Sequence, residues 1–332
     1  MKYLRLLLFP FSILFWLITT VRNKLYDWKI IKQIKLKIPV ISIGNIKTGG
    51  TGKTPFTIYL AEYLLGAKLK IAIISRGYKK NSGTEDYIVE GKENSPSIDK
   101  LGDEPYLIFT RLKSISDNFI LASGNSKSSL AKEVAEKYKP DIIIIDDGFQ
   151  HRKLYRDIDI VLTETPQNIL DNILLPAGNL RESKAGLGRA DIVIKNNKSQ
   201  LIETNDTTSI KYVNKGYYDT DNIRVELDNA VYTICGIANP HSFYSLINRD
   251  KLNILRKLEF ADHYSFKEDE LEKLFTGIDK EKVIVTTEKD FVKLKSMNEL
   301  FNKYKIVYLK IDVQFKKGKD IFENKMKDII YK

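Results

Sequence analysis

Apolar residues after position 38 fall into two alternating patterns. Short unbroken runs of Ile, Val and Leu predict buried strands, and longer stretches with apolar residues at helical spacing predict helices. The first set, within residues 38–200, consists of strands at 40–43, 70–75, 119–122, 141–145, 158–162 and 191–194, and helices at 54–65, 104–112 and 128–138. Unbroken apolar strands between helices are typical of a parallel sheet buried on both faces. The sequence therefore predicts an α/β fold in which helices sandwich a parallel sheet.

The same alternation resumes after a polar stretch, which indicates a second, smaller α/β domain. We interpret residues 201–229 as a linker, which is two-stranded if a hairpin forms around 211–218. The second domain, 230–332, is predicted to contain strands at 231–234, 282–286 and 306–311 and a helix that begins at His241.

The first 24 residues differ from the rest because they are almost wholly apolar. Leu6–Val21 carries no charge but is shorter than the ~20 residues that a straight helix needs to cross a bilayer. We interpret residues 1–24 as an uncleaved membrane anchor or an interfacial helix. The alternatives are a signal peptide, whose small-residue cleavage site is missing here, and a buried core helix. The basic stretch Arg22–Lys37 that follows favours a body on the cytoplasmic side.

Composition narrows the choice of partners and cofactors. Lys and Arg number 54 against 43 Asp and Glu, and the net charge of +11 favours anionic partners, namely nucleic acid, anionic lipid or a phosphorylated substrate. Many lysines stand beside Ile and Asn, so AT-rich coding is an equally good explanation of the charge. The single cysteine, Cys235, excludes an internal disulfide, and three histidines leave little room for a histidine-based zinc site.

A candidate phosphate loop lies between the first predicted strand and the first predicted helix. It reads Thr48-Gly49-Gly50-Thr51-Gly52-Lys53-Thr54. Glycines let backbone N–H groups converge on one point, and the helix N-terminus behind them adds further donors. Lys53 is expected to reach the β- and γ-phosphates and Thr54 to bind Mg²⁺. Lys47 replaces the usual first glycine, and a glycine-rich turn without nucleotide is the alternative.

Acidic residues follow the strand of consecutive isoleucines at 142–145. This position places Asp146 at the carboxyl end of a buried strand beside the phosphate loop, where it can hold Mg²⁺ or its waters. Adjacent side chains on a strand point to opposite sides, so Asp147 is expected to have a different role. The alternative is an acidic strand end that only caps the following turn.

Three further segments carry candidate chemistry, each with a structural alternative. Asp103, which opens a predicted helix, is either a general base or a helix cap. Arg181 and Glu182 form either a phosphate and Mg²⁺ site or a solvated charge pair. His263 is either structural or a proton carrier near Asp103, and the polar segment 286–290 suits a turn or a site.

These motifs in this order resemble the tetraacyldisaccharide 4'-kinase family of lipid A biosynthesis, and the resemblance covers nearly the whole chain. It rests on the N-terminal apolar helix and on Gly44-Asn45, 49–55, Ser75-Arg76-Gly77-Tyr78, 102–105, 146–151, 175–182, Asp262-His263 and 287–290. The resemblance implies transfer of the ATP γ-phosphate to the 4'-hydroxyl of a tetraacylated glucosamine disaccharide 1-phosphate at the inner membrane, with Mg²⁺. It also implies two α/β domains joined by a short β linker.

The resemblance assigns roles to individual residues. Asp103 and His263 look like the family's catalytic dyad, which requires the two domains to face each other. Lys53 and Thr54 look like its phosphate and Mg²⁺ ligands. The acidic residues around the metal would be Asp146, Asp147 and Glu182, and the substrate contacts would be Gln150, His151 and Arg181. Lys127 stands where the family often has arginine, which keeps the charge but not the bidentate geometry.

The implied partners are the acylated disaccharide and membrane lipids, which the apolar helix and its basic flank would contact. No nucleic acid and no obligate protein partner are expected. The rival classes are a membrane-associated switch ATPase, which usually has lysine at the position of Thr48, and a GTPase, whose Asn-Lys-x-Asp motif is missing. A nucleic-acid ATPase would explain the charge but not the apolar N-terminus.

Overall fold

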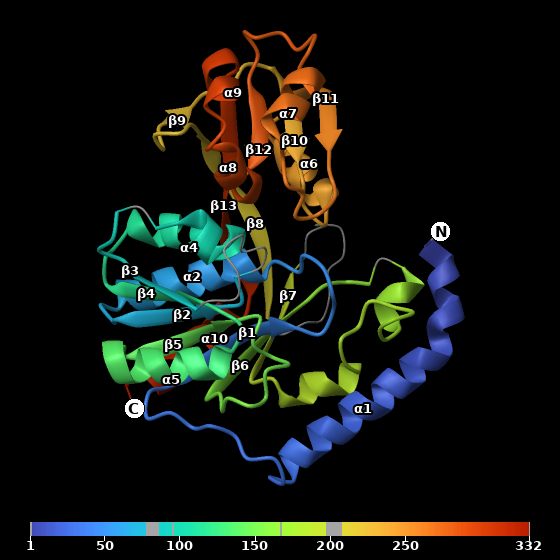
Figure 1. Cartoon of the computed structure of the whole chain (residues 1–332), viewed down its shortest axis with the longest axis vertical. Coiled ribbons are helices and arrows are strands. Elements are labelled where there is room, and N and C mark those ends of the chain that lie inside the picture. The colour runs from blue at the N-terminus through green and yellow to red at the C-terminus, as the bar shows by residue number, and fades with distance from the viewer. Residues whose placement is uncertain (1, 78–85, 95, 167, 197–207, 332) are drawn as a thin grey trace. The chain divides into compact units, whose positions relative to one another are not determined.

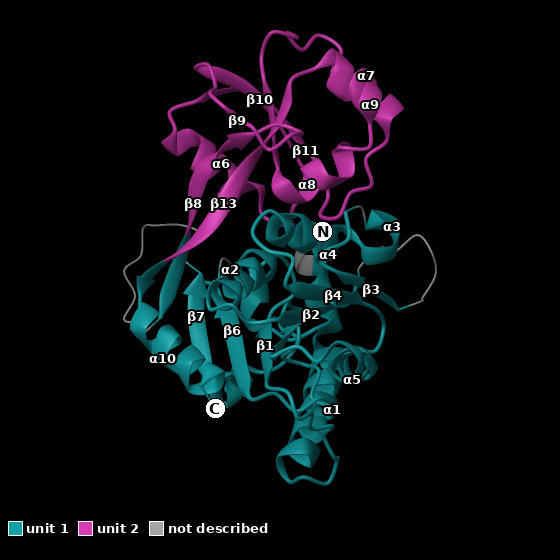
Figure 2. Cartoon of the chain, turned by 90° about the vertical axis from the view of Figure 1, so that its left-hand side faces the viewer, with its two compact units in different colours: residues 1–211, 315–332 teal, residues 212–314 magenta. Residues whose placement is uncertain are grey.

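The computed structural model describes residues 2–77, 86–94, 96–166, 168–196 and 208–331, with the side chains of residues 2 and 3 left aside. The chain forms two compact units, shown in Figure 2. Unit 1 comprises residues 1–211 and 315–332, and unit 2 comprises residues 212–314.

Unit 1 is built on a parallel sheet with helices on both faces. Its strands lie in the order β7-β6-β1-β5-β2-β4, with β3 antiparallel at one edge and the start of β8 parallel at the other. Figure 1 shows α2 and α4 on one face and α5 on the other. The strands are β1 Val40–Asn45, β2 Ile71–Ser75, β3 Tyr87–Glu90, β4 Phe119–Ser123, β5 Ile142–Asp146, β6 Ile158–Thr163, β7 Ile192–Asn196 and β8 Ser209–Tyr218. The longer helices are α2 Lys53–Gly66, α4 Asp103–Lys113 and α5 Lys127–Tyr138, and α3 Ile98–Leu101 precedes α4. The predicted α/β sandwich is therefore confirmed, as are its six predicted strands and three predicted helices.

The register of the central strands brings the candidate motifs together. Ile43 of β1 pairs with Asp146, the last residue of β5, and β1 continues two residues further, to Asn45. The phosphate loop leaves β1 just beyond this point, and Asp147 follows β5. The carboxyl end of a parallel sheet is where ligands of open α/β folds bind, and the strand order places both motifs there.

The N-terminal segment is helical and has an unusual distribution of side chains. It consists of a 3₁₀ helix, η1 Lys2–Leu8, and α1 Phe9–Asp27, which runs along the outside of unit 1 in Figure 1. Residues 4–27 are long and apolar enough to cross a membrane, judged by length and composition. Ser12 and Thr19 are buried, whereas the apolar side chains of Leu7, Phe11, Leu14 and Ile18 are 54–75% exposed. The helix thus presents polar residues to the protein and apolar residues outward.

Unit 2 is a smaller α/β unit. Four parallel strands lie in the order β11-β10-β12-β13, and β8 and β9 extend the sheet beyond β13. The elements are β9 Arg224–Val225, β10 Ala230–Cys235, α6 Pro240–Arg249, β11 Asn253–Glu259, α7 Glu268–Leu274, β12 Ile284–Thr287, α8 Glu288–Leu294, α9 Asn298–Lys303 and β13 Ile306–Lys317. The helix expected after the loop of Asp262 and His263 is α7, whereas β11, α8 and α9 were not predicted, because their apolar residues are few and interrupted by charges. Of the predicted linker, residues 201–207 lie outside the described residues, and the hairpin is formed by β8 and β9.

The C-terminus returns to unit 1, which differs from the predicted second domain of 230–332. The final helix, α10 Lys319–Ile330, buries Phe322, Met326 and Ile329 at helical spacing. The ring of Phe322 packs against Phe56 and Tyr63 of α2, with centroids 5.9 and 5.6 Å apart. This aromatic packing explains the difference, because it supplies a burial partner for α10 that is distant in sequence.

Candidate active site

The phosphate loop adopts a backbone that requires glycine. Gly49 has a φ of 97° and Gly52 has a φ of 88°, and Gly52 directly precedes the first residue of α2, Lys53. These left-handed conformations are strained for other residues. Thr51 is buried, and its hydroxyl accepts a hydrogen bond from the Asn45 side chain at 2.7 Å. The loop is thereby fixed to β1, with Lys53 and Thr54 in the first turn of α2.

Lys47 and Thr48 attach the start of the loop to a distant segment. Lys47 pairs with the buried carboxylate of Asp171 at 2.9 Å. The backbone N–H of Thr48 donates to the carbonyl of Asn179 at 2.7 Å, and its hydroxyl donates to the same oxygen at 3.1 Å. The lysine at position 47, which replaces the usual glycine, therefore helps to fix the start of the loop to the segment that contains Asp171.

Asp146 is buried between two hydroxyl groups. Its carboxylate accepts hydrogen bonds from Thr57 of α2 at 3.1 Å and from Ser75 at the end of β2 at 3.2 Å. Burial, and then the negative charge of Glu104, raises the pKa of Asp146 to about 6, although Lys127 opposes the shift. A buried carboxylate of this kind is stabilised in its ionised form by a nearby cation.

Asp147 has the opposite electrostatic environment and a left-handed backbone, with a φ of 50°. Both of its carboxylate oxygens accept from the Arg181 guanidinium at 2.8 Å, and Lys53 Nζ lies 3.5 Å away. Burial would raise the pKa of Asp147, but Lys53, Arg181 and Lys127 outweigh it and lower the pKa to about 2. The two acids therefore differ in electrostatic environment, and their different roles stay a prediction.

Lys127 holds the end of β5 in place. Its buried ammonium donates to the backbone carbonyls of Asp146 at 2.6 Å and of Asp147 at 2.7 Å. Burial lowers the pKa of Lys127, and the neighbouring Asp147 and Asp146 oppose this shift. The sequence could not indicate this role, because both acceptors are backbone atoms.

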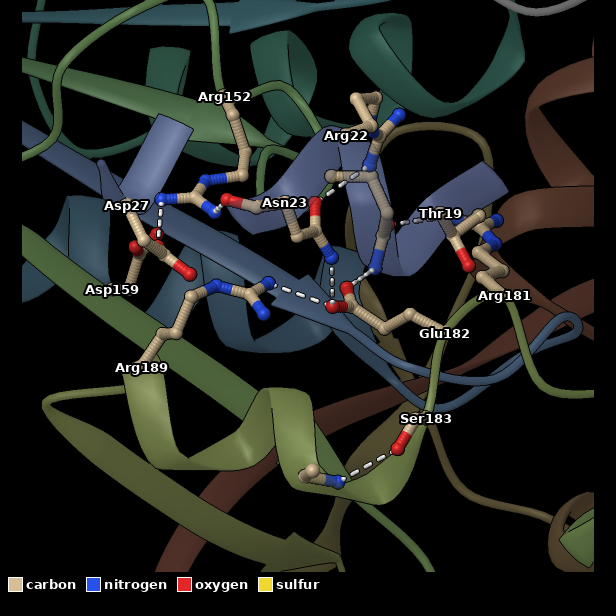
Figure 3. A network of polar contacts seen from close by, with 12 residues as sticks. Thr19, Arg22, Asn23, Asp27, Arg152, Asp159, Arg181, Glu182, Ser183 and Arg189 are labelled. Atoms are coloured by element: carbon tan, nitrogen blue, oxygen red, sulfur yellow. Dashed lines mark hydrogen bonds and ion pairs between the residues drawn. The ribbon is translucent and has the colours of Figure 1, made fainter. Parts of the chain in front are cut away.

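A polar network leads from Asp147 towards α1. The Gln150 side chain accepts from Arg181 at 3.4 Å and donates to Glu182 at 2.8 Å. Buried Glu182 also accepts from Arg189 at 2.7 Å and from Asn23 of α1 at 3.4 Å. Figure 3 shows Glu182 between Asn23 and Arg189. Sequence reasoning missed Arg189 and Asn23, for which no motif gives a signal.

The four predicted metal ligands do not form one cluster. Within the described residues, no group of three or more His, Cys, Asp or Glu side chains is placed to hold a metal ion. Glu182 instead binds Gln150 and Arg189. Thr54 is one helical turn before Thr57, the residue that contacts Asp146. Since Mg²⁺ in phosphoryl-transfer sites usually takes one or two carboxylates plus waters and phosphate oxygens, Thr54, Asp146 and Asp147 suit this ion without a larger cluster.

Asp103 is the first residue of α4 and is half-buried. The N-cap position belongs to Gly102, which has a φ of 89°, so Asp103 is not the N-cap. Among the described residues no hydrogen bond to the Asp103 carboxylate is formed. Its neighbour Glu104 is close enough to Asp146 to raise the pKa of that acid. Asp103 therefore lies on the side of unit 1 that carries the phosphate loop.

His263 lies in unit 2, in the loop between β11 and α7. Its φ of 58° is left-handed, and its backbone N–H donates to the carbonyl of Gly236 at 3.3 Å. The ring nitrogen Nε2 lies 3.0 Å from Lys289 Nζ. Because Asp103 and His263 belong to different units, their action as a dyad stays a prediction.

His151 should remain neutral well below the ordinary pH range of histidine. Burial, and then the positive charges of Lys127, Arg156 and Lys153, lowers its pKa to about 4. Its Nε2 atom is buried and has no hydrogen-bond partner among the described residues. We expect NMR of ¹³C-labelled histidine to show the His151 signal titrating near pH 4.

The same shift makes folding stability depend on pH. Because the pKa of His151 is lower in the folded chain than in the unfolded chain, the unfolded chain binds the proton more strongly between about pH 6.5 and 4. The wild-type thermal midpoint should therefore fall more than that of His151→Gln on acidification through this range. Equal falls in both proteins would contradict the assignment.

Comparison with known proteins gives matches over nearly the full chain. A model of the family described as tetraacyldisaccharide-1-P 4'-kinase, LpxK, matches residues 4–331. The tetraacyldisaccharide 4'-kinase of Flavobacterium psychrophilum is 36% identical, over 98% of this chain and 97% of that protein. The tetraacyldisaccharide 4'-kinase of Flavobacterium johnsoniae is 33% identical, over 89% of each chain. The crystal structure of "apo" form LpxK from Aquifex aeolicus in complex with ATP has a TM-score of 0.78 at 30% identity, over 99% of this chain and 98% of that one.

Proposed function

The chain belongs to the tetraacyldisaccharide-1-P 4'-kinase family, and we propose that it transfers the γ-phosphate of ATP to the 4'-hydroxyl of a tetraacylated glucosamine disaccharide 1-phosphate, a lipid A precursor. The observation that carries this proposal is the cluster of Lys53, Asp147 and Arg181 at the phosphate loop. The backbone N–H groups of the loop and the two cations lie together at the carboxyl end of the sheet. This arrangement suits the binding of a transferring phosphoryl group.

The charges of this cluster suit a nucleotide triphosphate. Lys53 is held near the loop by Asp147, and Arg181 neutralises the same carboxylate. Lys127 adds a third positive charge close by, and Arg76 is near enough to act on its pKa. In phosphoryl transfer most of the catalytic effect comes from positioning and charge stabilisation, so these residues are proposed to bind and orient the phosphates.

Mg²⁺ is proposed to bind at Thr54, Asp146 and Asp147. The raised pKa of Asp146 supports this, because a buried carboxylate gains most from an adjacent cation. When bound, the ion would supply positive charge that neutralises the phosphate groups. Asp103 is proposed to accept the proton of the attacking hydroxyl, with His263 assisting it. Gln150, His151 and Arg181 are proposed to contact the substrate, and Gln150 also keeps Arg181 oriented.

The N-terminal helical segment, η1 and α1, is proposed to lie in the plane of the membrane and not to span it. Polar contacts tie its whole length to unit 1. Arg5 donates to Asn179 Oδ1 at 3.1 Å, and Ser12 donates to the carbonyl of Leu174 at 2.9 Å, while Asn23 reaches Glu182. The outward apolar face would enter the lipid, and the basic flank supports attachment at the cytoplasmic face of the bacterial inner membrane.

An outward-face variant should separate membrane binding from chemistry. Leu7→Ser, Phe11→Ser and Leu14→Ser together remove exposed apolar area without changing a residue that bonds to unit 1. We expect the triple variant to lose most of its binding to anionic vesicles in a flotation assay, while its turnover of detergent-dispersed acceptor stays within about twofold. Each fully buried apolar side chain of this size is worth about 1.5–3 kcal/mol, so the change in vesicle binding should be large.

The matched control carries the same type of change at exposed apolar residues away from α1. Ile115→Ser, Ile223→Ser and Leu255→Ser should leave vesicle binding unchanged. Normal vesicle binding by the α1 variant would reject the in-plane anchor.

The proposed activity is tested with purified full-length protein, γ-labelled ATP and the tetraacylated disaccharide 1-phosphate. Label should appear in a disaccharide bisphosphate, and omission of Mg²⁺ should stop the transfer. Turnover of ATP that depends on nucleic acid or on an added protein, with no labelled lipid, would instead support a rival class.

A further inference from the structure

The segment Thr287-Glu288-Lys289-Asp290 joins β12 to α8 and organises one end of unit 2. Asp290 is fully buried and is bound from three sides. Its carboxylate accepts from the backbone N–H of Gly236 at 2.8 Å, from the Thr287 hydroxyl at 2.8 Å and from Lys293 at 2.9 Å. A buried carboxylate with this many donors fixes the elements that supply them. The loop after β10 and the start of α8 are thereby held in one arrangement.

The loop that carries His263 is bound to this arrangement. The Gly236 residue that donates to Asp290 also accepts the backbone N–H of His263, at 3.3 Å. The left-handed backbone of His263, with a φ of 58°, is uncommon for a residue with a side chain. Such strain persists only where the surroundings determine the conformation, and it is enriched at functional sites.

Two lysines one helical turn apart on α8 contact the His263 loop. Lys293 donates to the carbonyl of Tyr264 at 3.2 Å. Lys289 Nζ lies 3.0 Å from His263 Nε2 and 3.3 Å from an oxygen of Asp262. The side chains of Lys289 and His263 are only 18% and 19% exposed, so this contact is not a solvated surface pair.

The contact between Lys289 and His263 determines which ring nitrogen carries the proton. A lysine ammonium has three hydrogen-bond donors and no acceptor. The Nε2 atom must therefore accept, which requires a neutral ring protonated on Nδ1. Asp262 stabilises the ammonium in this position, because its carboxylate lies beside it. The Nδ1–H group is then the hydrogen-bond donor of the ring. A donor of this kind can hold a carboxylate base in a fixed orientation.

We propose that Lys289 is a positioning residue that holds His263 as the neutral, Nδ1-protonated tautomer. The inference rests on the proposed function, in which His263 assists Asp103. Lys289 acts through His263 and needs no contact with either substrate. The segment 286–290, for which the sequence left a turn or a site as alternatives, then serves both purposes. Asp290 fixes the conformation of the loop that carries His263. Lys289 determines the tautomer of the His263 ring.

The test measures the tautomer and the turnover in the same samples of full-length protein. The chain has three histidines, so ¹⁵N-histidine labelling gives a simple long-range ¹H–¹⁵N spectrum, in which His263→Gln assigns the signal. The wild type should show the Nδ1-protonated pattern at His263. Lys289→Met should shift this signal towards the Nε2-protonated tautomer, and Lys289→Arg should restore the wild-type pattern, because arginine is also a pure donor.

The kinetic arm separates a positioning role from a structural one. Lys289→Met should lower kcat about tenfold or more, a part of the 10²–10⁴-fold that general acid–base catalysis provides, with an unchanged KM for ATP. Lys289→Arg should recover part of the loss. The matched control is Lys295→Met, which makes the same change just after α8, where Lys295 donates to the carbonyl of Thr220. Lys289→Leu, which likewise has no donor, is the second variant if Lys289→Met fails to fold.

The outcomes are distinct. An Nε2-protonated His263 in the wild type, or a tautomer unaffected by Lys289→Met and Lys289→Leu, overturns the proposal. A tautomer shift without a change in kcat overturns the positioning role. If the wild-type chain does not phosphorylate the acceptor, the proposed function fails, whereas the NMR result still decides whether Lys289 controls the tautomer.

Discussion

Lys53→Ala is expected to lower kcat for phosphoryl transfer by about 10²-fold or more. The loss of one preorganised charge at a transferring group typically costs several kcal/mol in the transition state. Lys53 is the cation in the first turn of α2, and it lies 3.5 Å from Asp147. Without it, Arg181 remains paired with Asp147 and is not placed on the loop itself. The remaining charges of the cluster should therefore not replace it.

Single-turnover measurement at saturating ATP and acceptor checks this prediction. Lys132→Ala is the matched control, because Lys132 is an exposed residue of α5 whose ion pair with Glu136 lies on the surface. It should leave kcat unchanged. Near-normal turnover by a folded Lys53→Ala protein would mean that the loop has another purpose.

Asp103→Ala and His263→Ala should each lower kcat strongly, by about 10²-fold, with little change in the KM for ATP. A general base contributes about 10²–10⁴-fold, and neither residue is expected to bind the nucleotide. The double variant should be much less impaired than the product of the two single losses, because residues that act as one unit are not additive. This coupling is the sharpest test of the dyad, since the two residues belong to separate units.

Matched controls exist for both members of the pair. Asp117→Ala removes an exposed carboxylate of unit 1, and His241→Ala removes an exposed imidazole of unit 2. Neither should change kcat. Multiplicative losses in the double variant of Asp103 and His263 would show independent roles and reject the dyad.

Local patterns in the sequence were sufficient for the core of unit 1. The consecutive isoleucines of β5 and the apolar run of β1 predict buried parallel strands, and the glycines between β1 and α2 predict the loop. Elements with mixed patterns were not found. The strand β11 lies at the edge of the sheet, carries charged residues and is mostly exposed. It therefore lacks the unbroken apolar run by which the buried central strands were predicted.

Contacts between distant segments were beyond the reach of the sequence. The role of Lys127 depends on two backbone carbonyls about twenty residues away, and the environment of Glu182 depends on α1. Glu182 was expected beside the metal because its motif suggests it, yet its carboxylate binds Gln150 and Arg189. Only the packing of α1 against the 174–189 segment reveals this.

The N-terminal helical segment turns its polar side chains towards the protein and its apolar side chains outward. This arrangement has a consequence for what the segment can contact while the chain is being synthesised. Arg5 leaves the ribosome long before its partners at Pro176, Gly178 and Asn179, which are 171 to 174 residues further along the chain. At about 5–20 residues per second, this interval lasts roughly ten to thirty seconds. During that time the apolar face of the helix has no protein surface to cover it, nor does the finished fold provide one. In the proposed membrane attachment, the bilayer is the surface that can receive the nascent helix first, which would bring the chain to the membrane before unit 1 has folded.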